Sequence, residues 1–254
     1  MINLIRSEVL KIRSTQVWFW MLLLAVAFTA LATIGTVVGS IDDYKHNGNP
    51  IRYYDIFTVS QSAGVALLVL GLLGLTTEFR HKTITPTLLA TPNRWALLAG
   101  KASSYVIFAM IYAAICIAVN FAIAILWLNA ENLPISYGHG VGGGVLKSYL
   151  SLVFTGLFGL GLGALIRNQA ASMVFGIVYL FILDNLLNFV PLVRKGYAWT
   201  PGGAIKAFTS NGHVEGMPHD VHLLAPLAGG AVFILWSLGL LVLGGQISLR
   251  RDIS

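Results

Sequence analysis

The segment "TTEFRHKTITPTLLATPNRWALLAGK", residues 76–101, lies between two long apolar stretches but is itself neither uniformly apolar nor a short loop. It combines basic side chains with Ile, Leu and Trp and contains two Thr-Pro steps. Thr85-Pro86 and Thr91-Pro92 each match a helix start, because Thr caps free backbone N–H groups and Pro has no N–H to lose at the first helical position. The segment therefore predicts two short helical starts.

The length of this segment also needs a reason. A connection between two successive membrane spans needs only a few residues, and longer connections are often functional. We expect its apolar side chains to form a surface on which a partner docks, and the alternative is an interfacial linker. Glu78 and Arg80, at the mouth of the preceding apolar stretch, are expected to be a wet charge pair, which costs little at a membrane edge.

The stretches on either side have the composition of membrane spans. Of the 254 residues, 56% are hydrophobic and 10% are charged, too few polar side chains to cover a soluble protein of this size. The charges collect between apolar runs near the roughly 20 residues that cross a bilayer as a helix. We expect an all-α integral membrane protein, one domain of residues 1–254, whose six transmembrane helices cover about residues 17–39, 58–77, 103–128, 146–166, 171–191 and 225–245.

The basic residues predict which side of the membrane each loop faces. Most Lys and Arg lie in residues 1–16, in residues 78–102, at Arg167 and in the C-terminal tail, whereas those of the opposite loops are offset by Asp and Glu. By the positive-inside rule, both termini and residues 78–102 are cytoplasmic, and residues 192–224 form an extracellular loop. The dispersed basic residues form no stripe for nucleic acid, and orientation and anionic lipid explain them better.

Residues 1–16 carry an amphipathic pattern. Ile2, Ile5, Val9 and Ile12 fall on one helical stripe, and the charged residues lie elsewhere. That arrangement is typical of a helix lying in the membrane interface. A basic flank that only sets the topology is the alternative.

Polar residues inside the expected spans are candidates for a transport path. Asp184 and Asn188 share a helix face in the fifth span, and burying an unpaired ionisable group in lipid costs at least a few kcal/mol. Gln61 in the second span and Asn120 in the third could line the same path. The alternative for these residues is an interhelical hydrogen bond, and for Asp184 also a wet outer mouth.

Glycines at four-residue spacing predict close helix approach. Gly159 and Gly163 form such a pair in the fourth span, and Gly35 and Gly39 form another in the first. Small residues at this spacing let two helix backbones come together, either between two copies of the chain or within one subunit. For the fourth span we favour packing within one subunit.

Nothing in the sequence predicts that this chain hydrolyses ATP. Gly100-Lys101 is a chance fragment of a phosphate-binding loop, because Trp95 and Ala102 stand where that loop needs Gly and Ser or Thr. No catalytic set stands out either, so we expect no enzyme activity.

A metal site and redox chemistry are not predicted either. His213, His219 and His222 gather in the outer loop, but their spacing matches no helical zinc motif. The single cysteine, Cys116, lies inside an apolar run and is expected to serve packing. In the same outer loop, Trp199 and Pro201 indicate a partly folded or re-entrant cap over an exit.

The run "EFRHKTITPTLLATP" followed by "GK" resembles the cytoplasmic loop between the second and third spans of type-2 ATP-binding-cassette (ABC) transporter permeases, in particular the small bacterial six-helix exporters. The amphipathic N-terminus and the number of spans extend the resemblance along the chain. In that family this loop contains the coupling helix, which sits in a cleft of a separate ATPase subunit. Carried over, residues 85–91 are the helix core, and the ATPase-docking residues are Glu78, Arg80, Thr83, Thr85, Leu88, Leu89 and Thr91.

The resemblance implies the permease subunit of an ATP-driven exporter in the bacterial plasma membrane. ABC ATPase subunits would bind ATP and Mg²⁺, a second permease copy or sister permease would complete the path, and this chain would hold no cofactor. The substrate class is an amphiphile, such as a drug, an antibiotic peptide or a lipid. The alternative function is a gradient-driven small transporter or a membrane assembly subunit that uses Asp184.

Overall fold

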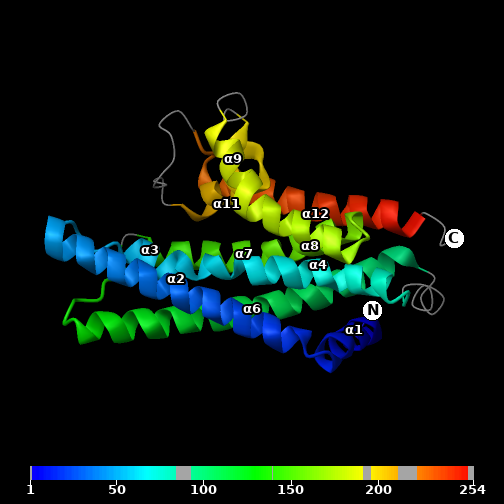
Figure 1. The fold of residues 1–254 in the computed structure, drawn as a ribbon, viewed down its shortest axis with the longest axis horizontal. Coiled ribbons are helices and arrows are strands. Elements are labelled where there is room, and N and C mark those ends of the chain that lie inside the picture. Colours follow the sequence, from blue (N-terminus) through cyan, green and yellow to red (C-terminus); the bar gives the residue numbers. More distant parts are fainter. Residues whose placement is uncertain (1, 84–92, 139, 191–195, 211–221, 251–254) are drawn as a thin grey trace.

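The computed structural model describes residues 2–83, 93–138, 140–190, 196–210 and 222–250, and every regular element in these ranges is a helix. The chain order of the elements is visible in Figure 1. They are α1 (Ile2–Ser14), α2 (Val17–Asn47), α3 (Tyr53–Thr58), the 3-10 helix η1 (Val59–Ala63), α4 (Gly64–Arg80), α6 (Arg94–Ala130), α7 (Val141–Leu165), α8 (Gln169–Val178), the π-helix η2 (Tyr179–Leu183), α9 (Asp184–Phe189), the 3-10 helix η3 (Tyr197–Trp199), α11 (Pro201–Thr209) and α12 (Pro226–Arg250).

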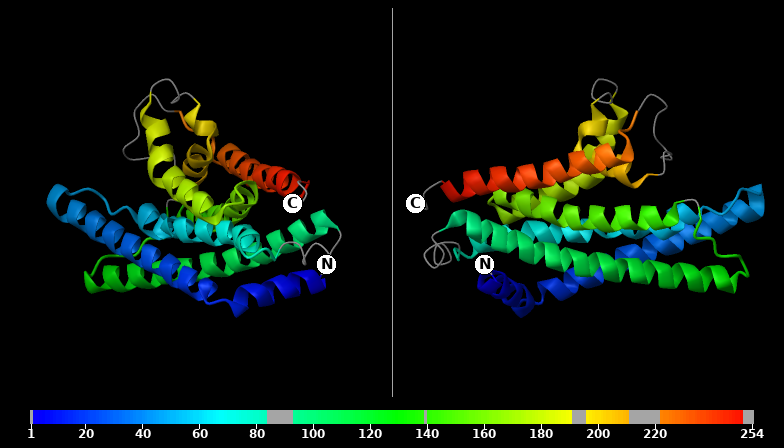
Figure 2. Two further views of the ribbon diagram at one scale, coloured as in Figure 1. Left: turned by 45° about the vertical axis from the view of Figure 1, so that its right-hand side comes forward. Right: turned by 180° about the vertical axis from the view of Figure 1, so that it is seen from behind.

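The long helices lie roughly side by side in three layers. Helices α4 and α7 form the middle layer, α2 and α6 lie on one side of it, and α8 and α12 lie on the other (Figures 1 and 2). Helix α1, the end of α4, the start of α6 and the end of α12 all lie at one end of the molecule. We call this end the terminal end, and the opposite end, with α3, the distal end.

Within the described residues, five helices are long and apolar enough to cross a membrane, which gives the chain the character of a helical membrane protein. They are Val17–Asn47, Tyr53–Arg80, Trp95–Ala130, Val141–Leu165 and Pro226–Gln246. Each contains one of the predicted spans or most of it. The predicted span 171–191 instead falls on α8, η2 and α9, of which the apolar part, Gln169–Leu183, is shorter.

Glycines let α4 and α7 pack with their backbones in contact. A Cβ at Gly159 would lie 2.3 Å from the carbonyl oxygen of Leu68, and one at Gly163 would lie 2.7 Å from that of Leu72. Real side chains do not approach a backbone so closely, so only glycine fits at these positions. The prediction that this pair packs within one subunit is confirmed. In contrast, a Cβ at Gly35 or Gly39 of α2 would meet no atom within 4 Å.

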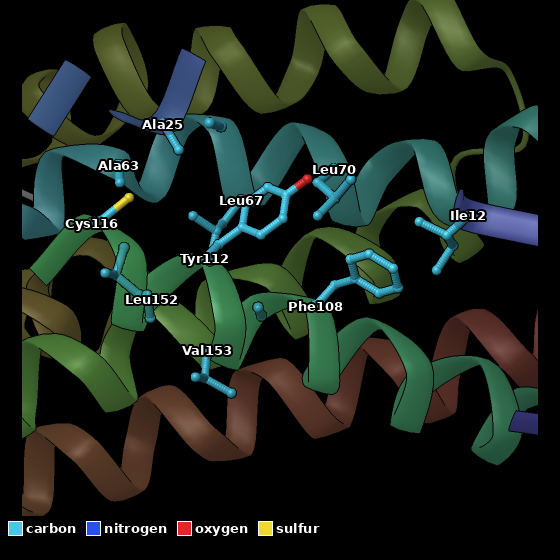
Figure 3. Close-up of a cluster of buried hydrophobic side chains, with 13 residues drawn as sticks. Ile12, Ala25, Ala63, Leu67, Leu70, Phe108, Tyr112, Cys116, Leu152 and Val153 are labelled. Atoms are coloured by element: carbon cyan, nitrogen blue, oxygen red, sulfur yellow. The ribbon is translucent and has the colours of Figure 1, made fainter. Parts of the chain in front are cut away.

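A buried core of the bundle joins α1 to the long helices α2, α4, α6 and α7. Figure 3 shows Ile12 of α1 near Phe108 of α6, with Leu67 and Leu70 of α4 beside Tyr112. Cys116 belongs to the same buried cluster and is a free thiol, so the prediction that it serves packing is confirmed. The apolar stripe of the N-terminal segment therefore contacts the helix bundle.

Part of the outer loop is folded. Thr200 caps α11 by accepting a hydrogen bond from the Gly203 backbone N–H at 3.1 Å, with Pro201 at the first helical position. This short helix packs on α12, where a Cβ at Gly229 would lie 2.7 Å from the Cβ of Ala207, whereas the helical turns of α9 stand away from the layered helices in Figure 2. The described part of residues 192–224 thus holds helical turns, whereas residues 211–221, with His213 and His219, lie outside the described ranges.

Replacement of Gly159 by Ala tests the close packing of α4 and α7. We expect Gly159→Ala to lower the free energy of unfolding by about 2 kcal/mol, because the new methyl group forces two backbones apart. The matched control, Gly39→Ala, meets open space and should change stability by less than about 1 kcal/mol. Thermal melting in detergent measures both, and equal melting temperatures for the two variants would contradict the packing.

Candidate functional site

Four charged side chains form a buried cluster at the terminal end, which we call the charge cluster: Glu8, Lys11, Glu78 and Lys101. The Lys101 ammonium nitrogen lies 2.6 Å from Glu8 Oε2 and 3.0 Å from Glu78 Oε1. The Lys11 nitrogen lies 3.1 Å from Glu8 Oε1 and 2.5 Å from Glu78 Oε1. Each carboxylate therefore bonds to both lysines, and the two positive and two negative charges balance.

The burial of the charge cluster makes it different from a surface ion pair. Glu8, Glu78 and Lys101 are 3%, 4% and 1% exposed. Charges taken out of water are costly unless they are paired in good geometry, and removing one partner then leaves the other uncompensated. The three side chains are thus held together strongly, whereas Lys11 lies at the wetter edge of the cluster with about half of its side chain exposed.

Three elements supply these side chains. Glu78 is in the last turn of α4, Lys101 is in the second turn of α6, and Glu8 and Lys11 lie on α1. Helix α1 can approach α6 because residue 100 is a glycine, where a Cβ would lie 2.6 Å from Leu4. The Ser104 hydroxyl adds a hydrogen bond to the Ile5 carbonyl at 3.3 Å. The charge cluster therefore ties both ends of the segment 76–101 to α1.

The electrostatics of the N-terminal helix favour the charged forms. Burial opposes ionisation of Glu8, but Lys101 and Lys11 outweigh it and hold the pKa of Glu8 below its usual value. Burial also opposes the charge of Lys11, but the bond to Glu78 and the charge of Glu8 outweigh it and raise the pKa of Lys11. Both residues consequently carry their charges at neutral pH.

The predicted docking residues are not all on the surface. Glu78 was expected at a wet membrane edge, but it is buried and bonded to two lysines, because α1 folds over it. Arg80 is exposed and bonds to Gln169 at 3.2 Å rather than to Glu78, and Thr83 is exposed. Thr85, Leu88, Leu89 and Thr91 lie outside the described residues, so their role stays a prediction.

Asn93, and not the predicted Thr91, is the residue that caps α6, the helix that follows the segment. Helix α6 begins at Arg94, and the side chain of Asn93 caps it by accepting from the Ala96 N–H at 3.1 Å. The predicted cap, Thr91, lies outside the described residues. Residues 94–101 of the segment therefore belong to helix α6, which continues past Lys101 as a long apolar helix.

Asp184, the acidic residue predicted inside a span, is buried at 6% exposure and is paired. Its Oδ2 lies 2.9 Å from the Lys206 nitrogen and accepts a hydrogen bond from the Tyr197 hydroxyl at 3.1 Å. Lys206 also bonds to the Tyr197 hydroxyl at 2.7 Å. This Asp184 group links α9 to η3 and α11. Asn188 also belongs to α9.

Local backbone features place the Asp184 carboxylate. The π-helix η2 ends directly before Asp184, and single π-turns of this kind recur at functional sites. Gly202 lies against the carboxylate, because a Cβ there would stand 1.6 Å from Asp184 Oδ1. The Tyr179 hydroxyl accepts from the Gly202 N–H at 3.3 Å. The π-helical turn precedes the carboxylate, and the glycine lets α11 come close to it.

The structure separates the other two predicted path residues. Asn120 is buried, and its amide donates to the Thr33 hydroxyl and to the Ile56 carbonyl, both at 2.9 Å. It ties α2, α3 and α6 together, as the alternative interpretation held. Gln61 instead lies in η1 and lines a cleft whose wall also contains Lys206. Gln61 and Lys206 of the Asp184 group thus border the same cleft, whereas Asn120 does not line it.

Sequence reasoning missed Glu8, Lys11 and Lys101 as a cluster and Lys206 as the partner of Asp184. For Glu8 a signal was present, because it lies three residues after Ile5 and four before Ile12, so it shares a helix face with the apolar stripe. For Lys206 a signal was also present, because the Thr200-Pro201 step predicts the start of a helix and Lys206 lies on that helix. The pairing itself depends on tertiary structure.

Comparison of the chain with protein families and with curated proteins finds no match. Among the described residues, no three His, Cys, Asp or Glu side chains gather as they would around a metal ion. The charge cluster and the Asp184 group are therefore the features from which a function has to be argued.

Removal of Lys101 tests how strongly the charge cluster holds the terminal end together. We expect Lys101→Met to cost about 3 kcal/mol or more of unfolding free energy, because two buried carboxylates lose their shared partner. The matched control is Lys45→Met, since Lys45 forms an exposed ion pair with Glu131 at 2.6 Å and should cost less than about 1 kcal/mol. Denaturation in detergent micelles compares them, and similar losses in both variants would contradict the assignment.

The pairing of Asp184 with Lys206 predicts an unequal effect of removing either partner. Lys206→Met leaves a buried carboxylate that keeps the Tyr197 hydroxyl but has lost its positively charged partner, whereas Asp184→Asn leaves a lysine whose side chain is 31% exposed and can reach water. We expect the lysine variant to be the less stable, and the double variant to recover about 1 kcal/mol relative to the sum of the single losses. Additive losses in a thermal double-mutant cycle would show that the two charges do not interact.

Proposed function

We propose that the chain is the membrane-spanning permease subunit of an ATP-driven ABC exporter. Residues 76–101 are the segment on which separate ATPase subunits dock, and these subunits bind ATP and Mg²⁺. Two copies of the chain, or one copy and a sister permease, enclose the path of an amphiphilic substrate. Closure of the ATPase subunits moves the docked segments, and the path opens alternately to the two sides of the membrane.

The charge cluster is the observation that supports this proposal most. It fastens the beginning and the end of the docking segment, through Glu78 and Lys101, to the same helix α1. A push on the segment would therefore act on α1, α4 and α6 together rather than bend a free loop. A linker without a mechanical role does not need buried charges at both of its ends, bonded to a third buried charge on α1.

The arrangement of the termini is consistent with this proposal. Both ends of the described chain and both ends of the docking segment lie at the terminal end (Figure 1). We place this end in the cytoplasm of a bacterial cell, following the positive-inside rule, and the distal end outside the plasma membrane. In this proposal α8, the π-helix η2 and α9 together act as the sixth span, and residues 1–254 form one permease domain.

The gradient-driven alternative depends on Asp184 as a proton or ion site. Lys206 and Tyr197 already occupy one oxygen of this carboxylate. This pairing supports a structural role for Asp184 in joining α9 to α11, so the exporter remains the better supported function.

Association with an ATPase tests the proposal. The tagged chain is isolated gently from its native membrane, and the eluate is analysed by mass spectrometry and for ATP hydrolysis. We expect a P-loop ATPase in stoichiometric amount, and we expect it to be lost when Leu88 and Leu89 are both replaced by Glu, because the docking surface becomes charged. The chain should remain folded, since these changes lie outside the charge cluster.

The matched control is Leu10→Glu, an exposed apolar residue on α1 at the same end of the molecule. This variant should keep the ATPase. Isolation of the chain alone and without ATP hydrolysis, under conditions that preserve a known ATPase–permease complex, would overturn the proposal. Equal loss of ATPase in the Leu10→Glu control would show that residues 76–101 are not the docking segment.

A further inference from the structure

A large cleft opens at the distal end between α2, α3, η1, the connection after α6, and α11. Its volume is about 1220 Å³, and its wall includes Gln61, Tyr54 and Lys206. Pockets that bind drug-sized molecules typically have about 300–1,000 Å³, so this cleft has room for a larger amphiphile. The Tyr54 hydroxyl donates to the Thr209 carbonyl at 2.5 Å and thereby joins α3 to α11 across the cleft wall.

The polar part of the wall offers N–H donors to a negatively charged group. It carries Arg52, Lys206 and one carboxylate, Asp55, and Lys206 is also paired with Asp184. The Lys206 ammonium has three N–H donors, and the described residues use two of them, for Asp184 and for the Tyr197 hydroxyl. Because Lys206 also lines the cleft, its third donor can bond to an acceptor there.

Gln61 supplies a second polar group of the same kind. It lies in the 3-10 helix η1, where the second long span is locally distorted, and transporters often build binding sites from such interruptions. No hydrogen-bond partner of its amide is found among the described residues, although the side chain is half-buried in the cleft wall. The Gln61 amide can therefore donate to a ligand in the cleft.

Aromatic and aliphatic side chains form another part of the wall, with Ser, Thr and Pro residues between them. They are Tyr44, Tyr53, Tyr54, Ile51, Val59 and Leu133. Such side chains contact an acyl chain or an apolar ring system well. The cleft therefore offers a cationic, donor-rich part and an apolar part side by side.

We propose that this cleft binds an anionic amphiphile, whose phosphate or carboxylate headgroup bonds to Lys206 and Gln61 and whose apolar part lies against the tyrosines and aliphatic side chains. Because Lys206 also bonds to Asp184, the bound headgroup joins the hydrogen-bond network that links α11 to α9. This inference rests on the proposed function only where it takes the amphiphile to be the exported cargo. The binding itself requires no ATPase.

The experiment uses the purified full chain in uncharged maltoside micelles and measures how a ligand protects a cysteine in the cleft. Replacing the buried Cys116 by Ala and Ser136, in the cleft wall, by Cys gives a single thiol whose rate of modification by a maleimide is followed. The probes are lysophosphatidylglycerol, lysophosphatidylcholine with the same acyl chain, and inorganic phosphate. In a control variant, Ser14→Cys places the thiol at an exposed position at the other end of the molecule, and its modification shows whether a probe acts on the maleimide itself.

We expect lysophosphatidylglycerol, which carries a net negative charge, to protect Cys at position 136 at a concentration about tenfold below that of lysophosphatidylcholine, because the choline cation of the latter offsets the charge of its phosphate beside Lys206. Gln61→Leu, which removes the unpaired amide without breaking a bond within the described chain, should raise the protecting concentration several-fold. Lys45→Gln removes a cation at the same end outside the cleft wall and should change nothing.

Equal protection by the two lysolipids would overturn the anionic preference, and unchanged protection in Gln61→Leu would overturn the assigned headgroup position. Protection by inorganic phosphate at the same concentration would show that the apolar wall contributes nothing and would overturn the amphiphile. None of these outcomes depends on an ATPase. Failure here therefore leaves the association test of the proposed function intact, and failure of that association leaves ligand binding intact.

Discussion

The ammonium of Lys101, held between Glu8 and Glu78, is the interaction on which the terminal end of the molecule depends. All three side chains are almost fully buried, so their charges are compensated only by one another and by Lys11. The bonds connect three elements that lie far apart in the sequence: α1, the end of α4 and the start of α6. Whatever acts on the segment between α4 and α6 therefore acts on α1 as well.

The rest of the helix bundle carries this connection toward the distal end. Helix α4 packs directly on α7, because glycines such as Gly159 and Gly163 leave no side chain between the two backbones. Closely packed helices move as units and transmit displacement, since packed interiors have low compressibility. Beyond the bundle, the Asp184 group joins α9 to α11, and Lys206 belongs both to this group and to the wall of the cleft. In our proposal, an ATP-driven movement at the terminal end and a ligand in the cleft act on the same connected set of helices.

Sequence patterns predicted the helical membrane character, the positions of most long helices and the packing role of Gly159 and Gly163, because hydropathy and small-residue spacing are local properties. They did not predict that Glu78 is buried, since its burial requires α1, whose Glu8 is 70 positions away along the chain. They also did not predict the pairing of Asp184, whose partner Lys206 lies in the outer loop on a short helix of its own. The change from α-helix to π-helix before Asp184 could not be inferred either, because "GIVYLFILDN" looks uniformly helical. Charge pairs between distant elements thus limited the prediction of the site.

The most direct test of the central claim is hydrogen–deuterium exchange of the backbone in the parent chain and in Lys101→Met. If the charge cluster holds three elements as one unit, the backbone amides of the variant will exchange faster in all three of them: in α1, in the last turns of α4 and in the first turns of α6. The amides of α7 will stay protected. Faster exchange confined to the first turns of α6, with α1 unchanged, would contradict the account, because the segment would then have no common anchor.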